Sequence, residues 1–130
     1  MTLDENKAIS RRWLEAGFGC GDTAVMEELI PLKLLQEGSL REQIVAYRAG
    51  FPDITVTIEQ QIAEDDRVVS VLTFRGTHTG DLLGLPPTGK SMELTMVEID
   101  TIRSGKVVDI WSDFHPIRVL QQLGLVVGKE

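Results

Sequence analysis

The spacing of hydrophobic residues changes once along this chain, close to residue 50. Before that point apolar residues recur three or four positions apart, as Ile9, Trp13 and Ala16 do, which is the period of one helix face. Glycines end the first helical segment, and a connector at 31–38 separates the second from the third. The pattern predicts helices at residues 4–18, 23–30 and 40–50.

Beyond the third helix the apolar period becomes two, so that Ile54, Val56 and Ile58 alternate with polar side chains. This alternation predicts strands at residues 54–59, 67–74, 92–102 and 107–114. A tight turn at 103–106 joins the last two strands as a hairpin, and Pro116 begins a short final helix. Helices followed by strands indicate an α+β fold, in which a curved antiparallel sheet carries the helices on one face.

Composition narrows the range of partners and compartments. The 130 residues suit one domain over residues 1–130, and the net charge of −7 argues against nucleic acid and anionic membranes, which are polyanions. No apolar run approaches the roughly 20 residues needed to cross a bilayer, and the polar N-terminus is unlike a signal peptide, so we expect a cytoplasmic protein. The single Cys20 excludes an internal disulfide, and no spacing of His, Cys and carboxylates resembles a metal site.

Residues 73–90, TFRGTHTGDLLGLPPTGK, are rich in residues that fix a backbone conformation. Four glycines permit turns, two prolines fix φ, and His78 lies among them. One interpretation of His78 is structural, with its ring tying the loop to backbone groups, and the other is catalytic. The loop lacks the helix that follows a phosphate-binding P-loop.

The segment RGTHTGDLLGLPPTGK is followed by about fifteen residues of strand, then by SGKVVDIWSDF and by VLQQLG. This succession resembles the SnoaL-like polyketide cyclase family of the nuclear transport factor 2 cone-fold superfamily, and the likeness runs from Val68 to Gly124. The resemblance implies a bent sheet that wraps a long N-terminal helix and leaves an apolar pocket at the open end of a cone. It also implies cofactor-free ring closure by intramolecular aldol condensation of a hydrophobic carbonyl compound, with a pocket carboxylate as acid and base.

The last predicted strand carries the first candidate for that carboxylate. Strand alternation puts Asp109, Trp111, Asp113 and His115 on one face. We expect this face to border the pocket mouth, with Trp111 as a wall and Asp113 as the acid–base group. The family places its carboxylate about four residues after the tryptophan, where this chain has His115, so His115 is the other candidate. The alternative is that both aspartates face solvent, Trp111 belongs to the core and His115 caps the final helix.

Glu98 and Asp100 form a second candidate pair, on the strand face that also carries Leu94 and Met96. Two carboxylates roughly 7 Å apart along a strand raise each other's pKa if both are buried. The alternative, which we favour for Asp100, is a place at the solvated rim or an ion pair with an arginine. Three further residues are candidates for lining the pocket, with a place in the core as the alternative: Trp13, Tyr47 and Met96.

These observations leave three hypotheses of function. The first is a cofactor-independent cyclase or isomerase, with Asp113 as acid–base group, His115 or Glu98 as its helper, and His78 organising the loop or the oxyanion side. The second is hydrolysis of an epoxide by an Asp-Arg-Asp cluster, part of which Arg75 beside Asp113 or Asp100 could supply. The third is a non-catalytic binding or dimerisation module. The apolar outer face expected of the sheet also predicts a homodimer.

Overall fold

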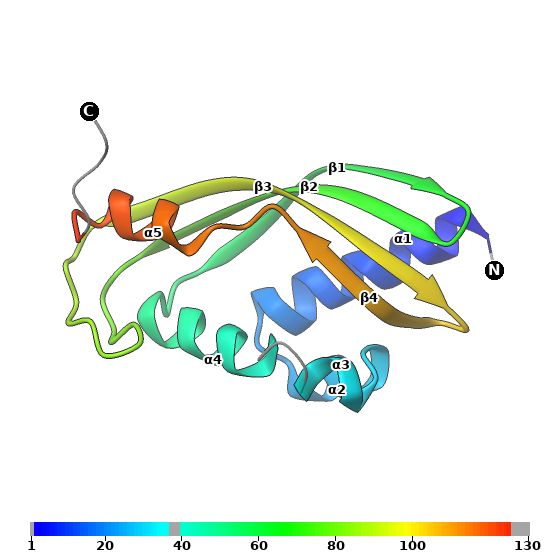
Figure 1. Cartoon of the computed structure of the whole chain (residues 1–130), viewed down its shortest axis with the longest axis horizontal. Helices are drawn as coiled ribbons and strands as arrows, with labels where there is room; N and C mark the ends of the chain where they lie inside the picture. The colour runs from blue at the N-terminus through cyan, green and yellow to red at the C-terminus, as the bar shows by residue number, and fades with distance from the viewer. Residues whose placement is uncertain (1, 37–39, 126–130) are drawn as a thin grey trace.

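The computed structural model describes residues 2–36 and 40–125. Helices come first along the chain, a sheet follows, and a short helix ends the described part (Figure 1). No helix within these two ranges is long and apolar enough to cross a membrane. The helical elements are α1 (Leu3–Arg12), the π-helical turns η1 (Trp13–Gly19), α2 (Thr23–Leu29), α3 (Leu32–Gln36), α4 (Leu40–Gly50) and α5 (Pro116–Gln122).

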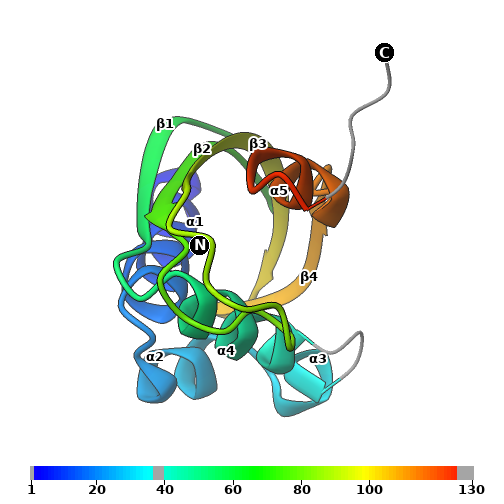
Figure 2. The ribbon, with the colours of Figure 1, turned by 90° about the vertical axis from the view of Figure 1, so that its left-hand side faces the viewer.

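Four strands, each antiparallel to its neighbours, form one sheet in the order β1-β2-β3-β4. The sheet is open, and it curves around α1 and α4 on its concave side (Figure 2). This arrangement confirms the predicted α+β fold with a curved antiparallel sheet and a short C-terminal helix. The strands are β1 (Thr55–Glu64), β2 (Arg67–Thr77), β3 (Ser91–Arg103) and β4 (Lys106–Ser112).

The helical third differs in detail from its predicted boundaries. The first predicted helix is α-helical only to Arg12 and then widens into the π-turns of η1. A Cβ on Gly17 would lie 2.8 Å from Cε3 of Trp13, so glycine at this position lets the indole ring pack tightly against the turn. The connector predicted at 31–38 contains the short helix α3.

A one-residue bulge in β4 decides which of its side chains face the helices. Thr101 pairs with Asp109 and Ile102 pairs with Val107, which leaves Val108 without a partner in the ladder. A bulge of this kind shifts the alternation of side chains by one residue. Val107 is therefore buried before the bulge, whereas the odd-numbered residues after the bulge turn outward.

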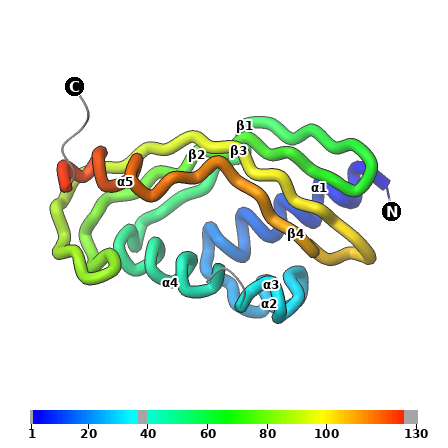
Figure 3. The backbone as a smooth tube through the Cα atoms, viewed as in Figure 1, coloured from blue at the N-terminus to red at the C-terminus, as the bar shows by residue number. Residues whose placement is uncertain are grey.

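The glycine-rich segment leaves the sheet after Thr77, extends toward the end of α4 and returns at the start of β3 (Figure 3). The backbone N–H of Gly80 donates to the carbonyl oxygen of Gly50 at 3.2 Å. A Cβ on Gly80 would collide with the carbonyl oxygen of Ala49. Glycine is therefore required where this loop docks on the C-terminal end of α4.

Candidate functional site

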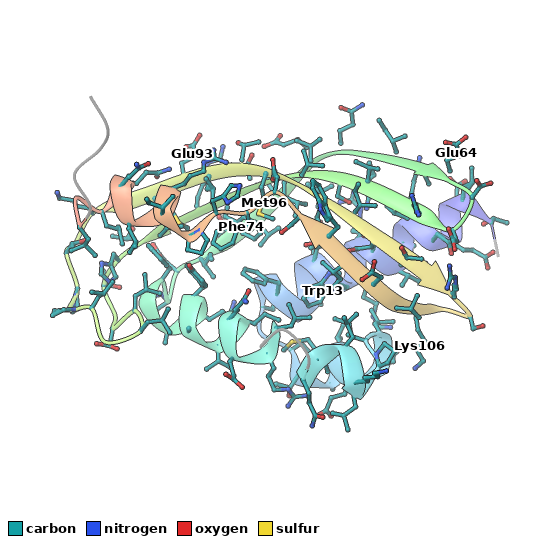
Figure 4. The ribbon with its side chains drawn as sticks, in the orientation of Figure 1. Trp13, Glu64, Phe74, Glu93, Met96 and Lys106 are labelled. Atoms are coloured by element: carbon teal, nitrogen blue, oxygen red, sulfur yellow. The ribbon has the colours of Figure 1, made fainter. Side chains whose placement is uncertain are left out.

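A cavity of about 110 Å³ lies between the inner face of the sheet and the helical layer formed by η1 and α4. Figure 4 shows Trp13 from the helical layer and Phe74 and Met96 from the sheet directed toward this space. The lining is mostly apolar, and it includes five aromatic side chains: Trp13, Phe18, Tyr47, Phe74 and Phe114. Such a lining favours an apolar ligand.

Glu98 is the only carboxyl group in the lining as far as the structure describes it. Its side chain is directed inward from β3 and is 6% exposed. The indole Nε1–H of Trp13 donates a hydrogen bond to Oε2 of Glu98 at 3.1 Å. Burial raises the pKa of Glu98 well above its usual value, and the neighbouring charge of Asp100 raises it further.

Asp100 lies two residues along the same face of β3 and is 1% exposed. The hydroxyl of Ser10 on α1 donates to its Oδ2 at 2.6 Å. Its other oxygen, Oδ1, is buried and meets no hydrogen-bond partner among the residues that the structure describes. Burial raises the pKa of Asp100, while Glu98 and the hydrogen bond from Ser10 oppose this shift.

The expectation that Asp100 lies at the rim or pairs with an arginine is therefore wrong. Arg75 pairs with Glu93 at 3.3 Å on the outer side of the sheet, and Arg103 pairs with Asp66 at 3.0 Å. Both arginines follow the outward parity of their strands, so neither is directed to the concave face where Asp100 is buried. The Asp-Arg-Asp cluster required by the epoxide hydrolase hypothesis is consequently not assembled around Arg75.

On β4 the face that borders the cavity is the opposite of the one expected from the sequence. Trp111 is 54% exposed and Asp109 is exposed on the outer side, so Trp111 is not a wall of the cavity. The physical reason is the bulge at Val108, which strict alternation does not anticipate. The cavity is instead lined on this side by Ile110, Ser112 and Phe114.

Asp113 and His115 lie beyond the end of β4 and do not line the cavity. The N–H of Asp113 donates to the carbonyl of Val97 at 3.2 Å, and its Oδ1 accepts from the N–H of Val97 at 2.9 Å. Asp113 thus extends the pairing of β3 and β4 by one residue. His115 is exposed at the N-cap position of α5, where its side chain makes no capping hydrogen bond. The catalytic roles predicted for these two residues remain predictions.

His78 is completely buried within the glycine-rich loop and does not line the cavity. Its Nδ1 accepts from the backbone N–H of Thr88 at 3.2 Å, and its ring lies 5.5 Å from that of Phe51. Its own backbone pairs with Lys90 and Gly89 across the loop. These contacts support a loop-organising role.

The same loop contains residues 84–91, GLPPTGKS, which fit the letters of a P-loop. Ser91, however, begins strand β3. The segment therefore lacks the helix N-terminus that holds phosphate in a P-loop.

Three of the expected lining residues, Trp13, Tyr47 and Met96, do line the cavity. Tyr47 packs edge-on against Phe114, with ring centres 5.5 Å apart, and burial raises the pKa of its hydroxyl. Ser10 was not singled out from the sequence. Ser10 lies three residues before Trp13, on the same helix face. A polar residue on an otherwise inward face is the pattern that could have identified it.

The residues that the structure describes contain no group of three His, Cys, Asp or Glu side chains that could hold a metal ion. The two carboxyl groups of Glu98 and Asp100 are held by Trp13 and Ser10 instead. The arrangement thus offers one ionisable carboxyl group at the edge of a mostly apolar cavity.

The family model of the SnoaL-like polyketide cyclases matches residues 36–123 of this chain. The chain therefore belongs to this family, which confirms the resemblance seen in its motifs. A search of curated protein sequences found no match.

Solved structures with the same fold include proteins described by different activities. AclR from Streptomyces galilaeus, provisionally described as a hydroxylase, has a TM-score of 0.82 at 23% identity and covers 99% of this chain and 87% of its own. TsrD from Streptomyces laurentii has a TM-score of 0.81 at 21% identity, with coverage of 97% and 99%. IdmH from Streptomyces antibioticus, provisionally described as a polyketide cyclase, has a TM-score of 0.73 at 25% identity, with coverage of 95% and 99%. The fold alone therefore does not decide the reaction.

Proposed function

We propose that this protein is a cofactor-independent enzyme that transfers protons on a small, uncharged, apolar carbonyl compound, in a polyketide cyclase-like aldol closure or a related isomerisation. The observation that carries the proposal is a single buried carboxyl group, that of Glu98, at the edge of an otherwise apolar cavity. Glu98 takes the acid–base role in this proposal, in place of Asp113 and His115.

The chemistry needs a base next to a carbon that adjoins a carbonyl group, in surroundings from which water is excluded. A carboxyl group with a raised pKa is a stronger base when ionised and, when protonated, returns its proton at neutral pH. Ser112 lies opposite Glu98 in the β3–β4 register and also lines the cavity. Its hydroxyl is suited to donate a hydrogen bond to the carbonyl oxygen, where negative charge develops.

Cavity size and charge restrict the substrate. A volume of about 110 Å³ is below the roughly 300 Å³ at which pockets for drug-sized ligands begin, and closer to the roughly 150 Å³ of an apolar cavity that holds benzene. The described lining contains neither arginine nor lysine, so an anionic substrate would find no counter-charge there. We therefore expect a neutral molecule with one ring, or a short chain of similar size.

The proposal is tested by exchange of α-hydrogens for deuterium in monocyclic β-keto esters, followed by NMR in deuterated buffer. The protein should accelerate exchange, and Glu98→Gln should reduce the acceleration by about 100-fold or more, the usual contribution of a general acid–base group. Asp113→Asn is the matched control, because asparagine still offers an oxygen to the N–H of Val97. With this variant, the keto ester should exchange its α-hydrogens at close to the wild-type rate.

Two results would contradict the proposal. One is exchange of the keto ester's α-hydrogens at the wild-type rate in the presence of Glu98→Gln. The other is binding of the keto esters without any acceleration of exchange, which would identify a binding module. A fused three-ring β-keto ester is the size control, and it should neither bind nor exchange faster than it does without the protein.

We also propose that the protein is a homodimer that buries the outer face of the sheet. Cross-strand pairing places four apolar residues in a continuous row over all four strands: Ile62, Val69, Ile99 and Trp111. A second copy of the chain carries the same row, as a two-fold interface requires. Trp111→Glu should shift the protein to monomer in sedimentation experiments, and a wild-type protein that is monomeric at micromolar concentration would overturn this part.

A further inference from the structure

We propose that Glu98 and Asp100 hold one proton between them, with Glu98 protonated, Asp100 ionised, and Asp100 acting as the positioning residue that receives the proton when Glu98 must act as a base. The role in catalysis rests on the proposed function of Glu98. The shared proton itself is a property of the free protein and is measurable without a substrate.

Hydrogen bonds fix which oxygens take part. The indole N–H of Trp13 is always a donor, so Oε2 of Glu98 is an acceptor and a proton on Glu98 resides on Oε1. The hydroxyl of Ser10 donates to Oδ2 of Asp100. The oxygen that remains on Asp100, Oδ1, is buried without any partner in the described chain. A buried acceptor of this kind is unfavourable unless a donor reaches it.

Glu98 is the donor that removes this deficit. Both side chains are buried on the same side of β3 two positions apart, and the charge of Asp100 raises the pKa of Glu98. We assign the proton to Glu98 and the charge to Asp100, because the hydroxyl of Ser10 donates to Asp100 and stabilises its anion. A bond from Oε1–H of Glu98 to Oδ1 of Asp100 satisfies the one carboxylate oxygen that the protein otherwise leaves unpaired.

The surroundings make two ionised carboxylates unfavourable. The α1 and η1 side chains that contact the pair, Ser10 and Trp13, carry no charge. The other charged group that acts on Asp100 is Asp109 on β4, which has the same sign and raises the pKa of Asp100. The residues opposite the pair on the neighbouring strands are also uncharged: Ser70, Val68, Ser112 and Ile110. Two adjacent negative charges would therefore be buried without an offsetting cation among the residues that the structure describes.

A shared proton explains how one cavity carboxyl group performs both halves of the reaction. The proton first passes from Oε1 of Glu98 to Oδ1 of Asp100, and the ionised Glu98 removes the α-proton of the substrate, whose C–H electron pair enters the enolate. The enolate attacks the second carbonyl carbon, and Glu98 returns its proton to the new alkoxide. Asp100 then returns its proton to Glu98, so that no proton is gained or lost over the cycle.

The test counts protonated carboxyl groups in the substrate-free protein, by infrared difference spectra and by NMR of ¹³C-carboxyl-labelled Glu and Asp. At neutral pH we expect one protonated carboxyl group, which disappears in Glu98→Gln and persists in Asp113→Asn. In Asp100→Asn the pKa of Glu98 should fall, because the charge that raises it is removed. In Ser10→Ala the pKa of Asp100 should rise, because a hydrogen bond that stabilises its anion is lost.

Zero or two protonated carboxyl groups at neutral pH would overturn the proposal, as would an unchanged titration of Glu98 in Asp100→Asn. If Asp100→Asn does not fold, Ser10→Ala provides the same test through a smaller change. An unchanged pKa of Asp100 in Ser10→Ala would then overturn the proposal. Failure here is distinguishable from failure of the proposed function. If the pair shares one proton but the protein does not accelerate α-hydrogen exchange, the proposed enzymatic function is wrong. If exchange depends on Glu98 but Glu98 and Asp100 titrate independently, the proposed shared proton is wrong.

Discussion

Two groups of carboxylates lie close together on adjacent strands, and the fold gives them opposite environments. Glu98 and Asp100 are directed inward from β3 and are almost completely buried, one of them at the cavity. Asp109 is exposed on the outer side of β4, and Asp113 is half-buried beyond its end, where it pairs with the backbone of β3. Carboxylates on adjacent strands are thus buried in one place, and exposed or bonded to the backbone in the other.

The difference arises from the alternation of side chains along each strand. β3 alternates without interruption, so that every second residue from Met92 to Ile102 is buried. β4 contains the bulge at Val108, which turns the following aspartate and tryptophan outward. A single unpaired residue therefore decides which strand supplies the ionisable group, since the cavity receives whatever side chains follow the inward parity.

Inserting one alanine between Asp109 and Ile110 should have the largest effect, because it displaces every residue after the bulge by one position in the ladder with β3. Ile110 and Phe114 would then turn toward solvent and Trp111 inward, which should lower the free energy of unfolding by about 4 kcal/mol or more, the range for losing large buried side chains. Urea denaturation measures this. Val108→Ala keeps the bulge and should cost about 1 kcal/mol. Equal stability of the insertion variant and the parent would show that the register after the bulge does not decide which side chains face the cavity.

Most of the architecture was predictable from local patterns. Period-two alternation identified all four strands, and the motif succession identified the family, because both depend on residues that are close in sequence. The length of β1, which continues to Glu64, and the π-turns of η1 were not predictable in this way. Both depend on contacts between layers, which override local preference.

The site was harder to predict, for a physical reason. Glu98, Trp13, Tyr47 and Met96 were candidates because their parity and helix spacing point to the interior. The burial of Asp100 was not predicted, because its hydrogen-bond partner Ser10 lies 90 residues away in the sequence. The assignment of Trp111 to the pocket failed because a bulge has no sequence signature as clear as that of a turn.

The pH dependence of stability should separate the two groups of carboxylates next. The pKa of Glu98 in the folded protein is raised above its reference value of 4.5, so the folded state binds more protons than the unfolded state above that pH. Stability should therefore decrease as pH rises from about 4.5 to the folded pKa, by about 1.4 kcal/mol for each unit of difference. Chemical denaturation over this pH range measures the slope.

Glu98→Gln should flatten that slope, because glutamine does not titrate. Asp113→Asn should leave it in place, since Asp113 does not share the buried environment of Glu98. A slope of equal size in wild type and Glu98→Gln would show that another group causes the dependence. An increase of stability with pH over this range, removed by Glu98→Gln, would contradict the raised pKa directly.

A smaller effect is expected from Ser10→Ala. The hydroxyl of Ser10 donates to a buried carboxylate, so its loss should cost about 1.5–3 kcal/mol of unfolding free energy, the range for a hydrogen bond to a charged group. Ser70→Ala is the matched control, because Ser70 is equally buried but bonds to the neutral amide of Gln61. It should cost only about 1 kcal/mol. Equal losses in both variants would indicate that Asp100 is not ionised.

Asp113→Ala should have the smallest effect and completes the comparison. It removes the acceptor of the Val97 N–H at a half-buried position, so we expect a loss of about 1 kcal/mol in urea denaturation. Exchange of α-hydrogens should stay within a few-fold of wild type, because the backbone of Asp113 still donates to Val97 and Glu98 keeps its contacts. A loss of exchange comparable to that of Glu98→Gln, with stability preserved, would move the acid–base role from β3 to the end of β4. The strand with the bulge would then carry the chemistry, and the buried pair on β3 would be structural.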